Sequence, residues 1–257
     1  MQTRLLMSSS AFIVFLALGC AETESDSAAE AVPAAASVAE PSRLRATLEE
    51  KKAAFRATAD EEIKAIYADG IQAVRDAGVV EQAKNVGDAA PDFSLPDHQG
   101  EPVSLSGVLA DGPVVIVWYR GGWCPYCNLT LRAYQEHLET ISELGGTLIA
   151  ISPELPDETV NTVSENELDF IVLSDVNNEV AREFGLVFKL TPEVQELYNE
   201  RLGLAEHNGQ DSGELPLSAT YVIDADGMIA WAFLDADYRN RAEPADVAAA
   251  LNDLASQ

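Results

Sequence analysis

The sequence has 257 residues, 47% of them hydrophobic and 23% charged, so it is long enough to bury one full core and to carry extensions. Its 43 acidic residues against 16 basic ones give a net charge of −27, and a surface of that sign repels the phosphates of nucleic acids and anionic lipid headgroups. We therefore expect one globular domain with appendages and no nucleic-acid partner.

Residues 1–20 predict a secretory signal, because an arginine precedes an apolar run, residues 11–18, that is too short to span a bilayer. The run ends in Gly19 and Cys20, which resembles the lipobox of bacterial lipoproteins, although the Ala-Leu pair before Gly19 reverses the usual order. The resemblance implies that Cys20 is lipidated and that the protein is exported to the periplasm of a bacterium, touching the membrane only through this anchor. Cleavage after Ala21 by an ordinary signal peptidase is the alternative.

Two segments follow before the main domain. Residues 21–41 are acidic and rich in alanine, with no aromatic side chain that could offset the entropy of ordering, so they predict a disordered tether. Residues 42–80 carry apolar side chains at helical spacing after a candidate N-cap, Ser42. They predict a helical extension, either one long helix or a pair, that docks on the main domain or on a partner.

From residue 84 to residue 257 the pattern predicts a domain in which strands and helices alternate. The expected elements, in order, are a hairpin near 93–105, a strand at 114–118, a helix at 128–144, a strand at 147–152, a helix at 157–166, a strand at 170–173, a helix at 178–184, a hairpin of 220–224 with 228–234, and a helix at 244–255. Helical crossovers between strands predict an α/β fold with a central mixed sheet flanked by helices.

Cys124 and Cys127 fall where the strand 114–118 ends and the helix 128–144 begins. Free backbone N–H groups and the helix dipole favour thiolate there, and a Cys-x-x-Cys pair at a helix start can lower a thiol pKa from ~8.5 to between ~3.5 and ~7.5. A structural zinc site needs four ligands. Besides this cysteine pair, the chain has only Cys20 and three isolated histidines as candidates. A disulfide across two residues constrains the unfolded chain little. The sequence therefore predicts thiol redox chemistry with no metal and no cofactor.

Six stretches of the main domain carry a family resemblance. They are VGDAAPDFSLPDHQGEPVSL, VVIVWYRGGWCPYCNLTLRAYQ, LIAISPE, FIVLSD, ATYVIDADG and DYRNRAEP. In this order, over about residues 84 to 255, they resemble the alkyl hydroperoxide reductase/thiol-specific antioxidant (AhpC/TSA) family, in its subgroup with a Gly-Gly-Trp-Cys-Pro-Tyr-Cys motif. The resemblance implies a thioredoxin-like fold and reduction of hydrogen peroxide or organic hydroperoxides through a cysteine sulfenic acid. A Cys124–Cys127 disulfide would follow, reduced by an external dithiol that is thioredoxin-like or glutathione.

The resemblance also bears on which cysteine attacks the peroxide. Peroxiredoxins place a threonine three residues before the attacking cysteine, and this register makes Cys127 the peroxidatic residue and Cys124 the resolving one. Cys-Pro-Tyr-Cys is also the tetrapeptide of many glutaredoxins, in which the first cysteine attacks. A thioredoxin- or glutaredoxin-like thiol-disulfide oxidoreductase is therefore the alternative function, and a non-catalytic exported lipoprotein module is a second.

Arginines are the expected partners of the thiolate. Many peroxiredoxins carry an arginine over the thiolate at the position that Ser218 holds here. Thioredoxin-like proteins often carry a cis-proline at this position, which Ser218 does not match either. Arg120, and Arg241 by its match to a later arginine of the family pattern, are expected to stabilise thiolate and to donate to the peroxide. Arg239 lies beside Arg241 in the sequence. A surface ion pair is the alternative for each of the three.

Overall fold

The computed structural model describes residues 43–256. The expected signal segment with Cys20, the tether and the N-cap at Ser42 lie outside the described residues, and lipidation and export stay predictions. Across the described range, helices that combine the length and the apolar character needed to cross a membrane are absent.

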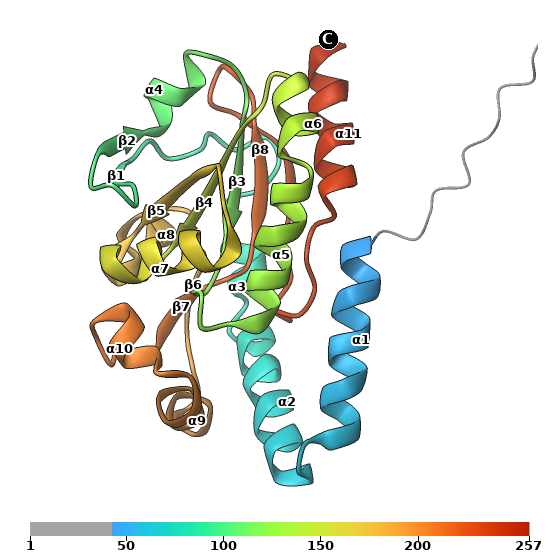
Figure 1. Ribbon diagram of the computed structural model, residues 1–257, viewed down its shortest axis with the longest axis vertical. Helices are drawn as coiled ribbons and strands as arrows, with labels where there is room; N and C mark the ends of the chain where they lie inside the picture. The colour runs from blue at the N-terminus through green and yellow to red at the C-terminus, as the bar shows by residue number, and fades with distance from the viewer. Residues whose placement is uncertain (1–42, 257) are drawn as a thin grey trace, which may run out of the picture. The chain divides into compact units, whose positions relative to one another are not determined.

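A five-stranded mixed sheet lies at the centre of the described residues (Figure 1). Its order is β5-β4-β3-β8-β9. β5, β4 and β3 pair in parallel, and β8 pairs antiparallel with both β3 and β9. The strands are β3 (Val114–Trp118), β4 (Thr147–Ser152), β5 (Ile171–Ser174), β8 (Thr220–Ile223) and β9 (Ile229–Phe233). The unbroken apolar run of β3 is buried at every position, as a central strand covered on both faces requires. The predicted α/β class with a mixed sheet is confirmed.

Helices cover both faces of this sheet (Figure 1). On one side lie α5 (Pro125–Glu136), α6 (Leu138–Glu143), α7 (Pro156–Asn166) and α11 (Pro244–Ala255), with α5 in contact with α6 and α7. On the other side lies α8 (Glu179–Glu183), which follows a 3-10 turn at Val176–Asn178. The single helix predicted over 128–144 is wrong, because the chain leaves helical geometry at His137. The His137 ring Nδ1 lies 2.9 Å from the Ala133 carbonyl, and the His137 amide donates to Tyr134 instead. The His137 side chain thus occupies the Ala133 carbonyl, which would accept from the His137 amide in a continuous helix.

The remaining strands form two small antiparallel pairs. β1 (Ser94–Pro96) pairs with β2 (Pro102–Ser104), as predicted, and leads into α4 (Leu105–Leu109). β6 (Val187–Lys189) pairs with β7 (Glu214–Pro216), and between them lie α9 (Pro192–Leu202) and α10 (Leu204–Asn208). Sequence analysis missed these four elements. The start of α9 nevertheless carries a visible signal, since the Thr191 hydroxyl accepts from the Val194 amide and Pro192 takes the first helical position.

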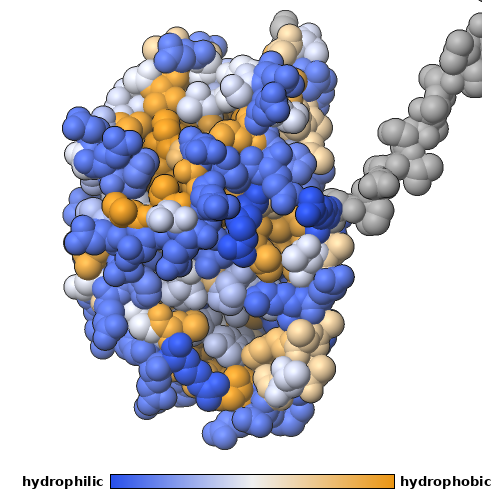
Figure 2. All heavy atoms as spheres, in the orientation of Figure 1, coloured by the Kyte–Doolittle hydropathy of each residue, from blue (hydrophilic) through white to orange (hydrophobic). Residues whose placement is uncertain are grey.

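The helical extension consists of α1 (Arg43–Thr58), α2 (Glu61–Asp76) and the short α3 (Val79–Gln82). Of the two possibilities left open by the sequence, the structure has the helical pair, with the break at Ala59 and Asp60. Leu44, Leu48 and Val74 join the same hydrophobic core as the sheet. In Figure 1, α1 lies beside α5, and α2 lies near α9. Hydrophilic side chains cover most of the face seen in Figure 2, with apolar residues between them.

Candidate active site

Cys124 and Cys127 lie where the sequence places them, between the end of β3 and the first turn of α5. Cys124 is the N-cap residue, and Pro125 takes the first helical position, where its missing N–H costs nothing. The Cys124 carbonyl accepts from the amides of Cys127 (2.9 Å) and Asn128 (3.1 Å). Both thiols are free and nearly fully buried. The local sequence thus folds the pair into one helical turn.

Two arginine groups contact the sulfur of Cys127. The Arg120 backbone amide lies 3.5 Å from this sulfur, and Nη2 of Arg241 lies 3.4 Å from it. Arg241 is buried and comes from the segment after β9. Ser218, at the position where the family resemblance expects an arginine, is buried and its hydroxyl has no hydrogen-bond partner among the described residues. The guanidinium in contact with the Cys127 sulfur is therefore that of Arg241.

Cys124 lines a cavity of about 320 Å³ whose wall does not include Cys127. Burial alone would raise the pKa of the Cys124 thiol, but a hydrogen bond from Cys127 and the charges of Arg120 and Arg241 lower this pKa to about 5. Burial raises the pKa of the Cys127 thiol well above its usual value, and the hydrogen bond with Cys124 and the negative charge there raise it further. The two shifts have opposite directions, which favours ionisation of the Cys124 thiol over that of Cys127.

The side chain of Arg120 lies in a cage of aromatic rings beside Cys124. Its guanidinium carbon is 3.9 Å from the ring centroid of Tyr238, 4.8 Å from that of Tyr198 and 5.0 Å from that of Trp123. Arg120 is 1% exposed, and its Nε and Nη1 find no hydrogen-bond acceptor among the described residues. Buried donors are normally satisfied, so two free donors at a cavity wall indicate a site for an acceptor atom of a ligand.

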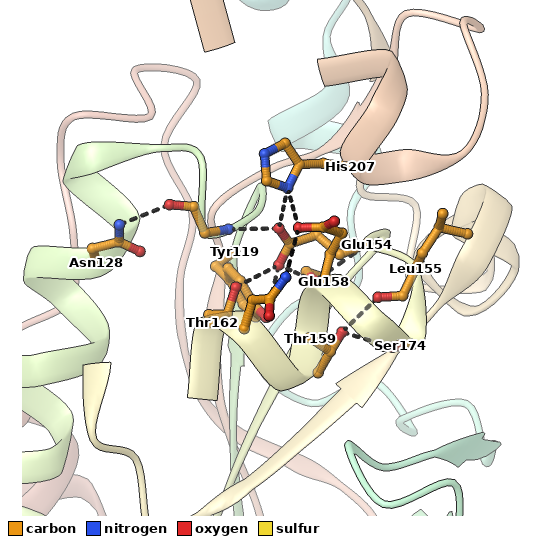
Figure 3. Close-up of polar contacts among 12 residues, drawn as sticks. Tyr119, Asn128, Glu154, Leu155, Glu158, Thr159, Thr162, Ser174 and His207 are labelled. Carbon is orange, nitrogen blue, oxygen red and sulfur yellow. Dashed lines mark hydrogen bonds and ion pairs between the residues drawn. The ribbon is translucent and has the colours of Figure 1, made fainter. Parts of the chain in front are cut away.

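A buried carboxylate holds the loop that carries the cysteines (Figure 3). Glu154, just after β4, is fully buried, and its Oε1 accepts from the Gly122 amide at 2.8 Å. The hydroxyls of Thr162 (3.1 Å) and Tyr119 (3.3 Å) donate to its Oε2. On the other side of Gly122, Asn128 donates to the carbonyl at 2.7 Å. Glu154 and Asn128 thus fix both polar groups of the residue that precedes the Trp-Cys-Pro-Tyr-Cys segment.

This network extends to the surface through His207 of α10. Nδ1 of His207 lies 3.5 Å from Glu154 Oε1 and 2.9 Å from Glu158 Oε2, and Figure 3 shows the ring above both carboxylates. The carboxylates of Glu154 and Glu158 beside the ring raise the pKa of His207. The role of Glu154 was not predicted, since nothing in the local sequence reveals that this carboxylate reaches a loop 32 residues earlier in the chain.

Glu154→Gln is expected to slow peroxide reduction on the order of 10- to 100-fold, because an amide cannot accept from all three donors and the loop shifts. The measurement is the second-order rate constant of the reduced protein with hydrogen peroxide, together with the melting temperature. Glu158→Gln is the matched control, since Glu158 contacts His207 but not the loop and is 30% exposed. Equal rates for the two variants would show that Glu154 does not position the cysteines.

The predicted residues Cys124, Cys127, Arg120 and Arg241 are therefore brought together, and Arg239 lies at the same cavity, ion-paired with Asp237. Sequence reasoning missed the aromatic residues of the cage outside the motif. These are Tyr198 and Tyr238, which come from α9 and from the segment after β9. Their distance from the motif in sequence left no local signal.

Comparison with known proteins identifies the family of the domain that carries this site. The AhpC/TSA family matches residues 86–232. A Mycobacterium tuberculosis protein assigned as a peroxiredoxin is 32% identical over 110 residues, which are 41% of this chain and 71% of that protein. Peroxiredoxin Bcp of Escherichia coli K12 is 29% identical over 100 residues, 39% of this chain and 64% of that protein.

Solved structures agree as well. Peroxidoxin BcpB of Mycobacterium tuberculosis superposes with a TM-score of 0.52 at 25% identity, over 66% of this chain and 97% of that chain. A peroxiredoxin-like protein from Aquifex aeolicus, at 17% identity and a TM-score of 0.53, covers 67% of this chain and 88% of its own, and it shows the fold alone. The thioredoxin-like fold is confirmed, and so is the predicted class of enzyme, a thiol-dependent peroxidase. The chain belongs to the AhpC/TSA family.

Proposed function

We propose that the chain reduces hydroperoxides through Cys124 and Cys127, with Cys124 as the attacking sulfur. The observation that carries this order is the position of Cys124 on the cavity wall, with Cys127 behind it. The lowered pKa of Cys124 supports it. The order differs from the one expected from the family register, which placed the attack at Cys127. That register compares positions along the chain and takes no account of which sulfur the cavity reaches.

The reaction balances with the two cysteines alone. The Cys124 thiolate attacks the terminal oxygen of the hydroperoxide, the O–O bond breaks, and the S–O bond of a sulfenic acid forms. The leaving alkoxide, or hydroxide from hydrogen peroxide, takes a proton and departs as alcohol or water. The Cys127 sulfur then attacks the sulfenic sulfur and displaces hydroxide, which leaves as water with the thiol proton of Cys127. A Cys124–Cys127 disulfide remains.

The free donors of Arg120 are suited to the first step. They lie beside Cys124 and have no hydrogen-bond partner among the described residues, so they can donate to the oxygen on which negative charge develops. Arg241, in contact with the second sulfur, favours ionised sulfur in the pair.

Return to the dithiol state takes two electrons from an external dithiol. We propose a thioredoxin-like protein or glutathione as this reductant, attacking the Cys124 sulfur because it is the one at the cavity. The same position of the first cysteine on the cavity wall favours the second candidate function, thiol-disulfide exchange with protein or glutathione disulfides.

The test compares the reduced protein with its Cys124→Ser/Cys127→Ser double variant. We expect the wild type to consume about one equivalent of peroxide per protein without added reductant, since one dithiol supplies two electrons, whereas the double variant consumes peroxide at the background rate. Insulin and glutathione mixed-disulfide reduction are measured in parallel. Equal peroxide consumption by both proteins would end the peroxidase proposal, and disulfide reduction faster than peroxide consumption would favour the second candidate.

A further inference from the structure

The cavity at Cys124 is lined in part by segments of the chain that lie outside residues 86–232, the range of the family match. α1 contributes Phe55, α2 contributes Tyr67, and the segment after β9 contributes Tyr238. The helical extension is therefore part of the wall of the active-site cavity as well as part of the core.

Aromatic rings from these separate segments contact one another around the cavity. Phe55 meets Tyr67 edge-on at a centroid distance of 5.4 Å, and Tyr67 lies 5.8 Å from Tyr198. Tyr198 in turn lies 5.4 Å from Trp123, the neighbour of Cys124. A continuous series of rings thus connects the α1–α2 pair to the reactive sulfur, and such ring contacts hold the wall in place.

The size of the cavity is a poor match for hydrogen peroxide. A cavity of about 320 Å³ lies at the lower end of the range of small-molecule sites, roughly 300 to 1,000 Å³. Hydrogen peroxide is little larger than water, whose share of liquid volume is about 30 Å³, so it would leave most of the cavity without contacts. An organic group with an aryl or branched alkyl body would fill the space and cover the apolar rings.

Two groups that can act on a peroxide line the same cavity. They are the Cys124 thiol and the Arg120 side chain, whose Nε and Nη1 have no hydrogen-bond partner among the described residues, whereas the guanidinium of Arg239 is occupied by Asp237 at 2.8 Å. A ligand with one small acceptor group and one apolar body matches this distribution. The peroxide group fits at the sulfur and Arg120, and the body fits against Phe55 and Tyr126.

We propose that this cavity is the binding site for bulky organic hydroperoxides, those with an aryl or branched alkyl body, and that the α1–α2 pair confers the preference for them over hydrogen peroxide. The inference rests on the proposed peroxidase function. Its physical basis is that burial of the apolar body adds favourable free energy which hydrogen peroxide cannot gain.

The test uses the full chain and the specificity constant, kcat/KM, for cumene hydroperoxide and for hydrogen peroxide. Phe55→Ala removes a ring from the wall, and Ile66→Ala is the matched control, since Ile66 is a half-buried residue of the same helical pair that does not line the cavity. In the wild type we expect cumene hydroperoxide to be favoured, and in Phe55→Ala we expect the ratio of the two constants to fall roughly tenfold. In Phe55→Ala, kcat/KM for hydrogen peroxide should change by no more than about twofold, because this small substrate does not contact the removed ring. Ile66→Ala should keep the wild-type ratio.

A wild-type measurement keeps the inference testable if Phe55→Ala fails to fold. The product alcohol, 2-phenyl-2-propanol, should inhibit hydrogen peroxide reduction competitively, and ethanol at the same concentration should not. No preference for cumene hydroperoxide, no competition by the alcohol, or an equal change of the ratio in both variants would each overturn the inference while leaving a peroxidase in place. A wild type that reduces neither peroxide would instead overturn the proposed function.

Discussion

Cys124→Ser is expected to abolish formation of sulfenic acid, lowering the rate of peroxide consumption by about a thousandfold or more, as loss of a nucleophile does. Cys127→Ser is expected to keep one turnover and to stop at the sulfenic acid, because no second thiol is left to form the disulfide. The serine hydroxyl at 127 can still donate the hydrogen bond that lowers the pKa of Cys124. The measurement is the intact mass of each reduced variant after one equivalent of peroxide with dimedone present.

The reverse pattern, with dimedone trapped at Cys127 in Cys124→Ser and none in Cys127→Ser, would restore the order expected from the family register. It would also require the chain to open, since Cys127 is fully buried and does not line the cavity. The wild type serves as control, because its disulfide should prevent dimedone addition and leave a mass two units below that of the dithiol, the loss of two hydrogens on disulfide formation.

Local sequence determined the core of this site well. Val114–Trp118 is an apolar run and Pro125 a residue suited to a first helical position, so the turn between them, with both cysteines, could be located from short-range rules alone. The last helix, over 244–255, was located correctly for the same reason, since its apolar periodicity is local.

Features that depend on tertiary contacts could not be predicted from short-range sequence rules. Arg241 reaches a sulfur 114 residues earlier in the chain, and it was anticipated only through the family resemblance. Tyr198 belongs to a helix that was missed altogether, and the Gly122 amide that donates to Glu154 lies 32 residues earlier in the chain. The burial of Cys127, on which the proposed order of attack depends, is decided by how the rest of the chain packs around α5.

Arg241→Met is expected to raise the apparent pKa of the reactive thiol and to lower the rate with peroxide on the order of a hundredfold near neutral pH, comparable to loss of one charge-stabilising donor. The guanidinium contacts the Cys127 sulfur and its charge helps to lower the pKa of Cys124, so its loss disfavours thiolate. Because thiolate is present above the thiol pKa, the rate–pH curve should move to higher pH. The deficit should be largest under acidic conditions and shrink as the pH rises.

Arg239→Met provides the matched control, since it removes the same charge two residues away. Arg239 is ion-paired with Asp237 and is not among the main charges that act on either thiol. Alkylation by iodoacetamide between pH 4 and 9, a range about the pKa of an activated cysteine, reports thiolate without depending on peroxide binding. We expect a shifted alkylation curve for Arg241→Met and the wild-type curve for Arg239→Met. Superimposable curves for the two variants would mean that Arg241 acts on protein packing rather than on the charge of the sulfur, and that Arg120 alone stabilises the thiolate.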